Sequence, residues 1–258
     1  MGENHIRPIY PKFCKREIPF SSKPKQKGEV HPYKMDEKGK SQVRKEIASM
    51  LEKGAIHVVQ EEKGQFLSNI FLREKKDASF RPIINLKKLN SHIPYEKFKM
   101  ETLNNVKDLL RQNDYLVKID LKDAYFSIPL GQKSRKYVRF QWEGTTYEFL
   151  CMTFGLGPAP KIFTKLLKVP VSLLRRLKIR ILIYIDNMLV MVTSLEEITI
   201  ARDTVVHLLQ ALGVHIEREE INVKTLQSDG VSGSHSELIF FSLLGNTPDT
   251  MEFGIKWK

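Results

Sequence analysis

The sequence is poor in cysteine and contains no apolar run long enough to cross a membrane. Its 258 residues include only two cysteines, Cys14 and Cys151, too few for a disulfide framework or a cysteine-based zinc site. A reducing, intracellular compartment is therefore expected, with nucleus and cytoplasm both open. A membrane-spanning helix needs roughly 20 apolar residues, and a secretory signal needs an apolar segment near the N-terminus. The sequence shows neither, so we expect no membrane partner.

Acidic residues are also scarce relative to basic ones. The chain has 42 Lys and Arg against 30 Asp and Glu, which gives a net charge of +12 and a pI near 9.5. Such an excess favours a polyanionic partner, with nucleic acid ahead of a membrane surface. The plainer alternative is a basic globular protein without such a partner. The length allows one large domain or two subdomains.

Hydrophobic periodicity predicts a mixture of helices and strands. Helices are expected over residues 36–53, 102–113, from Pro160 onward, and 195–212, the last after a capping box of Ser194 and Glu197. Strands are expected over residues 55–59, 66–72, 80–86, 115–121, 137–142, 145–150 and 238–244. Residues 214–237 are expected to be irregular.

The most informative stretch is residues 179–192, in which two apolar runs flank Asp186 and Asn187. Asp and Asn tolerate the positive φ angles of a two-residue hairpin turn. We expect a buried β-hairpin with Asp186 at its tip, where a carboxylate is well placed to hold a metal ion. Taken alone, the dipeptide is better explained by turn chemistry.

A second carboxylate ends another predicted strand. Val117, Ile119 and Leu121 share one face of residues 115–121, whereas Lys118 and Asp120 share the other. If this strand lies beside the Asp186 hairpin, Asp120 and Asp186 converge. Two converging carboxylates are the minimum protein contribution to a two-magnesium phosphoryl-transfer site.

A predicted β-ribbon over residues 66–86 carries Lys75, Lys76 and Arg81. Lys75 and Arg81 could neutralise charge on the phosphates of a triphosphate. Tyr125, close after Asp120, could form one wall of a sugar pocket. The alternative for the ribbon is an exposed hairpin with ordinary surface charges.

Four stretches, in this order along the chain, resemble motifs of retroelement reverse transcriptases. Residues 80–90 (FRPIINLKKLN) resemble the fingers motif with its triphosphate-binding arginine, and residues 116–130 (LVKIDLKDAYFSIPL) the first catalytic motif. Residues 154–163 (FGLGPAPKIF) resemble the template- and nucleotide-gripping motif, and residues 184–187 (YIDN) stand where the family has Tyr-x-Asp-Asp. Residues 92–95 and 163–168 are most similar to DIRS-like (tyrosine-recombinase) elements, with gypsy-like elements next. The resemblance covers about residues 40–213.

This resemblance implies an α+β, right-hand polymerase fold with an antiparallel palm sheet and flanking helices. The reverse transcriptase region would span residues 35–245, with fingers over about 35–114 and palm over about 115–245. Residues 1–34 would be an extended basic arm whose lysines either contact phosphate or are simply solvated, and residues 246–258 a tail. The thumb would be absent or vestigial.

The resemblance also implies roles for individual residues. Asp120 and Asp186 would be catalytic and would bind two Mg²⁺ ions, or Mn²⁺, together with the backbone carbonyl of Leu121, while Asn187 completes the catalytic turn. The residues implied in nucleotide binding are Lys75, Arg81, Asp123, Ala124, Tyr125, Phe154 and Gly155, with Tyr125 as the steric gate against ribonucleotides. Tyr184, Pro160 and Lys161 would contact nucleic acid.

The implied activity is RNA-directed DNA synthesis from dNTPs on an RNA or DNA template with a primer. Asn187 departs from the family because it offers a carbonyl oxygen but no negative charge, and metal affinity depends on ligand charge. Some viral RNA polymerases of similar fold carry Gly-Asp-Asn at this place. The alternative hypothesis is therefore a catalytically inactive remnant that still binds nucleic acid.

Overall fold

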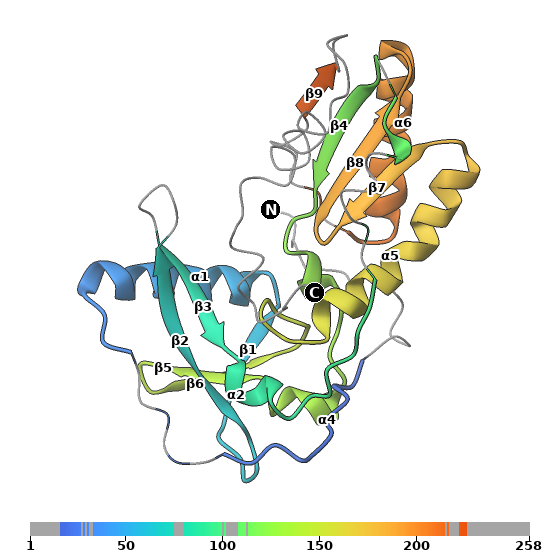
Figure 1. Ribbon diagram of the computed structural model, residues 1–258. Coiled ribbons are helices and arrows are strands. Elements are labelled where there is room, and N and C mark those ends of the chain that lie inside the picture. The colour runs from blue at the N-terminus through green and yellow to red at the C-terminus, as the bar shows by residue number, and fades with distance from the viewer. Residues whose placement is uncertain are drawn as a thin grey trace. The chain divides into compact units, whose positions relative to one another are not determined.

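The structure is a computed structural model that describes residues 16–26, 28, 30, 33–74, 80–99, 101, 108–111, 113–214, 216 and 222–225 (Figure 1). For Glu74, Phe80, Arg81 and residues 222–225 it describes the backbone only. Most of the arm predicted over residues 1–34, most of the helix predicted over 102–113, the strand predicted over 238–244 and Lys75 lie outside the described residues.

The chain forms two compact units, each built from two segments. Unit 1 comprises Met1–Glu96 and Tyr125–Pro160, and unit 2 comprises Lys97–Ala124 and Lys161–Lys258. The division into fingers and palm near residue 115 stays a prediction. Within the part of the chain that the structure describes, no helix is both long and apolar enough to span a membrane.

Unit 1 contains a five-stranded sheet. Its strands are β1 (Ile56–Val59), β2 (Leu67–Glu74), β3 (Phe80–Asn85), β5 (Arg139–Trp142) and β6 (Thr145–Phe149), in the order β1-β6-β5-β2-β3. Neighbours are antiparallel except for the parallel pair β2 and β5. The β2–β3 pairing confirms the predicted ribbon. Among the short helical elements, α2 (Lys87–Asn90) follows β3 and α4 (Gln132–Arg135) precedes β5, with the 3-10 helix η2 (Ala124–Ser127) between α2 and α4 in the chain.

Helix α1 (Glu37–Glu52) packs against β1 and β3, and its ends follow local chemistry. The Asp36 side chain accepts the Gly39 N–H at 2.8 Å, a typical N-cap bond. Gly54 follows the helix with φ +66°, the left-handed conformation that glycine adopts most readily. Val43 is fully buried, whereas Leu51, near the end of the helix, is 39% exposed.

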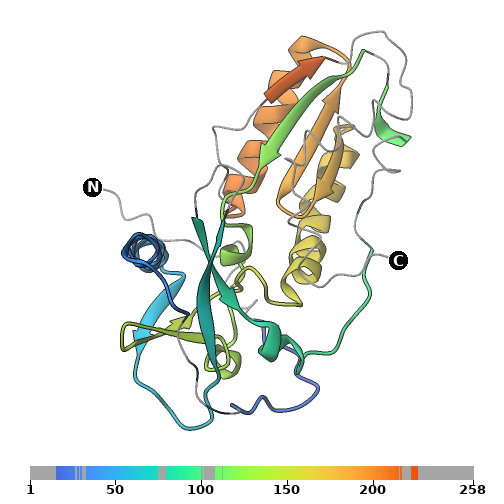
Figure 2. The same ribbon diagram turned by 60° about the vertical axis from the view of Figure 1, so that its left-hand side comes forward.

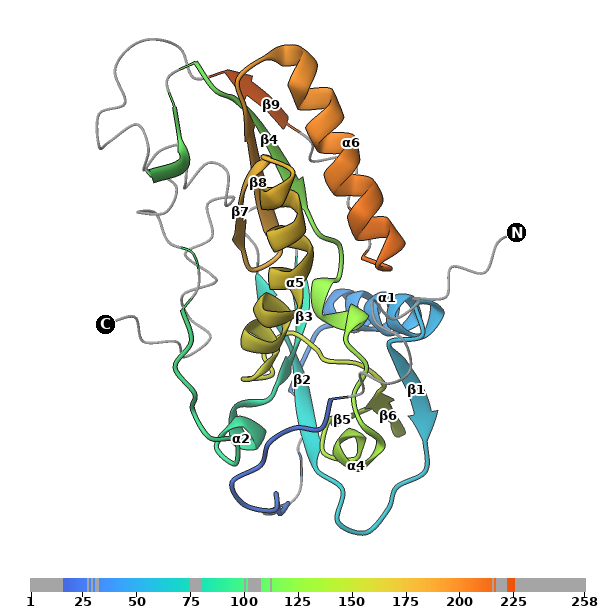
Figure 3. The ribbon, with the colours of Figure 1, turned by 90° about the vertical axis from the view of Figure 1, so that its right-hand side faces the viewer.

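Unit 2 contains an antiparallel sheet in the order β7-β8-β4-β9. Its strands are β4 (Tyr115–Asp120), β7 (Arg180–Tyr184), β8 (Asn187–Val192) and β9 (Asn222–Thr225). Figures 2 and 3 show α5 (Ala159–Arg176) and α6 (Leu195–Ala211) on the same face of this sheet. The sheet residues on its fully buried face include Val117, Ile119, Ile181 and Val190, each 0% exposed.

Strand β9 lies where irregular structure was expected. It pairs with β4 from Tyr115↔Thr225 to Lys118↔Asn222, so β4 is an inner strand with partners on both sides. The prediction was wrong here because four residues of mixed polarity carry no clear period of their own. The strand forms because β4 offers a free backbone edge, a tertiary influence that local sequence does not encode.

Candidate functional site

The polar face of the unit 2 sheet ends in a row of three side chains. In the strand register, Asp120 lies opposite Asn187 across β4 and β8, and Asn187 lies opposite Tyr184 across β8 and β7. The same face carries a buried apolar cluster further along the strands, formed by Leu116, Leu182, Leu189 and Met191. Packing of this apolar cluster therefore holds in place the strand backbone that bears the three side chains.

The hairpin prediction is confirmed, but its turn is displaced by one residue. Tyr184 pairs with Asn187, so Ile185 and Asp186 form the turn, with Asp186 at the tip. The positive φ falls on Ile185, at +56°, rather than on Asp186 or Asn187. A β-branched residue is rarely found in this conformation, and strain of order 1–2 kcal/mol is expected.

A backbone hydrogen bond joins the two strand ends that carry the carboxylates. The N–H of Leu121, the residue after Asp120, donates to the carbonyl oxygen of Asp186 at 2.8 Å. The pairing of β4 with β8 thus brings the backbones of Asp120 and Asp186 to neighbouring positions. Leu121 itself is 5% exposed.

The side chains around these carboxylates have specific partners. Lys118 Nζ lies 2.7 Å from Asp120 Oδ2, and the two side chains are only 12% and 15% exposed. The other oxygen of Asp120, Oδ1, is buried and makes no hydrogen bond. Asn187 Nδ2 donates to Asp186 Oδ1 at 3.1 Å. Asn187 thus directs its amide nitrogen at the neighbouring carboxylate.

The donor set fits a hard divalent cation. Asp120, Asp186 and the Leu121 carbonyl are oxygen donors, the type that Mg²⁺ and Mn²⁺ prefer. A buried carboxylate oxygen without a donor is unfavourable, and a bound cation would satisfy Asp120 Oδ1. No group of three or more His, Cys, Asp or Glu side chains suited to a metal occurs in the described ranges. Water and substrate oxygens would have to complete the coordination.

Tyr184, the β7 member of this row, remains a neutral phenol. Its side chain packs against the apolar cluster. Burial, and then the negative charge of Asp186, raise the pKa of Tyr184 above its ordinary value. The phenol keeps its proton and can donate a hydrogen bond.

Two ion pairs, which the sequence did not reveal, support β7. Arg180, the first residue of β7, makes a bidentate contact with Asp114, at 2.6 Å from each nitrogen to a carboxylate oxygen. Arg175 pairs with Glu101 and donates to the Ile181 carbonyl at 2.8 Å. Both arginines therefore have defined partners within unit 2.

In unit 1, the predicted nucleotide-binding residues Tyr125, Phe154 and Gly155 are brought together. Tyr125 is 4% exposed, and its ring meets that of Phe154 edge-on at 4.9 Å between centroids. Gly155 has φ +83°, and its carbonyl accepts Asn90 Nδ2 at 2.7 Å. Asn90 Oδ1 also accepts the Gly157 N–H at 2.9 Å, so Asn90 anchors this loop. Sequence reasoning gave Asn90 no role.

The remaining predicted residues lie on separate elements. Arg81 is in β3, opposite Arg73 of β2. Asp123, with φ +48°, and the buried Ala124 follow β4 in unit 2. Pro160 and Lys161 are the second and third residues of α5. A proline in the first turn is compatible with a helix, since the N–H there has no intrahelical acceptor.

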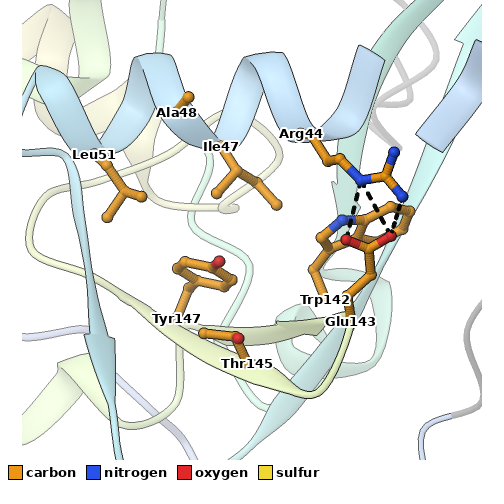
Figure 4. A pocket seen from close by; sticks show the side chains of 8 residues that line it. All are labelled: Arg44, Ile47, Ala48, Leu51, Trp142, Glu143, Thr145 and Tyr147. Carbon is orange, nitrogen blue, oxygen red and sulfur yellow. Dashed lines mark hydrogen bonds and ion pairs between the residues drawn. The ribbon is translucent and has the colours of Figure 1, made fainter. Parts of the chain in front are cut away.

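A shallow pocket of about 330 Å³ lies between α1 and the β5–β6 hairpin of unit 1 (Figure 4). Arg44 binds Glu143 at its rim, with the shortest contact at 2.6 Å. These hydrogen bonds hold the pKa of Glu143 below its ordinary value. None of the predicted site residues lines this pocket.

Residues 73–233, more than half of the chain, match the family described as Reverse transcriptase (RNA-dependent DNA polymerase). The chain is 27% identical over 162 residues to the retrovirus-related Pol polyprotein from transposon 297 of Drosophila melanogaster, covering 60% of this chain and 15% of that polyprotein. It is 24% identical over 201 residues to the enzymatic polyprotein of cauliflower mosaic virus (strain Strasbourg), covering 76% of this chain and 29% of that protein.

Solved structures of similar fold include the foamy viral protease-reverse transcriptase. Its dRH form in complex with ds DNA has a TM-score of 0.72 at 19% identity and covers 89% of this chain and 38% of that one. The complex with RNA/DNA hybrid has a TM-score of 0.69 at 19% identity, and the match covers 87% of this chain and 29% of that one. The predicted α+β polymerase fold is confirmed. This chain spans well under half the length of these proteins, and by its matched motifs and fold it belongs to the reverse transcriptase (RNA-dependent DNA polymerase) family.

Proposed function

We propose that this retroelement reverse transcriptase domain transfers nucleotides from dNTPs to a primer 3′-hydroxyl on an RNA or DNA template. The observation that carries the proposal is the hydrogen bond from the Leu121 N–H to the Asp186 carbonyl. With Asp120 paired to Asn187, it places the two carboxylate residues on adjoining strand ends. This arrangement supports a centre for divalent cations, which the family generally uses.

In this proposal Asp120, Asp186 and the Leu121 carbonyl hold two cations, Mg²⁺ or alternatively Mn²⁺. When bound, the cations lower the pKa of the attacking hydroxyl and stabilise the leaving pyrophosphate. Lys75 and Arg81 bind the triphosphate, and Phe154 with Gly155 contacts the incoming nucleotide. Asp123, Ala124 and Tyr125 line its phosphates and sugar, with Tyr125 excluding a 2′-hydroxyl. Tyr184, Pro160 and Lys161 contact the nucleic acid.

We also propose that the parent element is DIRS-like. The support is the amino-acid sequence of residues 92–95 (HIPY) and 163–168 (FTKLLK). A gypsy-like parent is the alternative. A phylogeny built on residues 80–213 would test this, and grouping with gypsy-like elements would refute it.

One contact favours a second candidate function, nucleic-acid binding without synthesis. The neutral Asn187 side chain adds no negative charge to the site, and its amide nitrogen donates to Asp186 Oδ1. The net charge of +12 is retained whether or not synthesis occurs. This candidate predicts binding whose log affinity falls steeply with log salt concentration, because phosphate contacts release counterions.

The deciding experiment is primer extension on an RNA template with a DNA primer, in Mg²⁺ and Mn²⁺ side by side. We expect incorporation by the native chain and its loss in Asp120→Ala. Activity confined to Asn187→Asp would locate the defect in the metal site. Synthesis that survives Asp120→Ala would refute the proposed site, and salt-sensitive binding with no synthesis in any variant would favour the second candidate.

A further inference from the structure

We propose that Lys118 sets the cation affinity of this site by competing with the bound cation for Asp120. The inference rests on the proposed function, in which Asp120 is a metal ligand. It assigns Lys118 a role that depends on charge rather than on packing. In this role Lys118 tunes the site through its charge and is not itself a metal ligand.

The geometry places the ammonium group on one oxygen of the carboxylate that is the proposed metal ligand. Lys118 and Asp120 are two residues apart on β4, so their side chains leave the same face of the strand. Nζ lies 2.7 Å from Oδ2, within the range of a charge-assisted hydrogen bond. Both side chains are more than four-fifths buried, so solvent and salt screen the pair less than they would a surface pair.

The two oxygens of Asp120 are in different states. Oδ2 is bound by Lys118, whereas Oδ1 is buried without a hydrogen-bond partner. A cation that binds Oδ1 therefore approaches a carboxylate whose charge is already neutralised from the other side. The Lys118 ammonium repels that cation, which must overcome the repulsion or displace the ammonium group.

The charge of the site makes the effect large. Asp120 and Asp186 contribute two negative charges, Lys118 one positive charge and Asn187 none, so these four side chains carry a net charge of −1. Neutralising Lys118 and converting Asn187 to Asp each raise the net negative charge to −2. Cation affinity rises with ligand charge, so these two changes, at different positions, should act in the same direction.

The rival explanation is an ion pair that only stabilises the sheet. Under that explanation, removing Lys118 loosens the site and leaves cation binding unchanged or weaker. Competition predicts tighter binding. A charge in contact with a carboxylate changes its proton affinity by about tenfold to 1,000-fold, so we expect an increase in Mn²⁺ affinity on the order of tenfold or more.

The test measures Mn²⁺ binding directly, through the electron paramagnetic resonance signal of the free ion, on the full chain without nucleic acid. Lys118→Met and Lys118→Gln both remove the positive charge. Lys118→Gln keeps a hydrogen-bond donor for Oδ2 and serves as the test variant if Lys118→Met does not fold. Lys118→Arg preserves the charge. Lys168→Met, at an exposed position on α5, controls for a change in net charge outside the site. Asp120→Asn identifies the binding that depends on this carboxylate.

We expect tighter binding in Lys118→Met and Lys118→Gln, near-native binding in Lys118→Arg and Lys168→Met, and a loss in Asp120→Asn. Native affinity or weaker in the two neutral Lys118 variants, with Asp120→Asn still defective, would overturn the Lys118 inference alone. Equal binding by the native chain and Asp120→Asn would refute the metal role of Asp120, and the Lys118 inference would fall with it.

Discussion

Replacing Arg180 by Met should destabilise unit 2 by about 3–5 kcal/mol, the cost of removing one partner of a buried ion pair. Asp114 is fully buried, and both of its oxygens lie 2.6 Å from Arg180 nitrogens. Met preserves much of the side-chain volume but leaves Asp114 with the Arg111 N–H, at 2.7 Å. One neutral donor cannot compensate a buried negative charge.

Urea unfolding gives the free energy directly. Arg176→Met, at an exposed position on α5, is the matched control and should change it by at most about 0.5 kcal/mol. The double variant Asp114→Asn/Arg180→Met should be more stable than Arg180→Met, since no unpaired buried charge remains. A loss below about 1 kcal/mol in the single variant, or no recovery in the double variant, would refute the reasoning.

Three further predictions concern pH and strain. The Thr193 hydroxyl and N–H donate to Glu197 and lower its pKa, so the stability that Glu197 contributes is present above pH 4.5 and is lost as the pH falls. In Glu197→Gln, the free energy of unfolding from urea denaturation should therefore depend less on pH in that acid range. The raised pKa of Tyr184 means that stability is lost as pH rises above 10, where the unfolded state ionises first, and Tyr184→Phe should remove this loss in alkaline unfolding curves. Ile185→Gly should raise the free energy of unfolding by about 1 kcal/mol, because it relieves the strain of the positive φ. If urea denaturation instead gives a lower free energy of unfolding, the Ile185 side chain stabilises the fold by more than its backbone strain costs.

Local patterns were sufficient wherever local chemistry decides the structure. Asp36 and Gly54 lie at the two ends of α1, as the preferences of these residue types for helix ends predict. The β5–β6 turn falls on Glu143 and Gly144, both with positive φ. The alternation of β4 correctly placed Lys118 and Asp120 on the face opposite to Val117 and Ile119. Each of these features depends on residues close together in the chain.

Features that depend on distant partners could not be predicted in this way. Propensity assigned the hairpin turn to Asp186 and Asn187, but the structure begins it at Ile185, a residue type that avoids positive φ. Pairing between strands overrides local preference here, since Asn187 is held in register with both Asp120 and Tyr184. Arg175 and Glu101 are likewise separated by 74 positions, and no local pattern links them.

The strained turn at Ile185 persists because the strands on which it is built are fixed from both sides. On the β4 side, the Leu121 N–H binds the Asp186 carbonyl. On the outer edge of β7, Glu101 accepts the Ile183 N–H at 2.8 Å, and Arg175 donates to the Ile181 carbonyl. A one-residue slip of β7 would break these bonds and reverse the face of every β7 side chain. The position of Asp186 is therefore set partly by Glu101 and Arg175, two residues outside every motif that identifies the family.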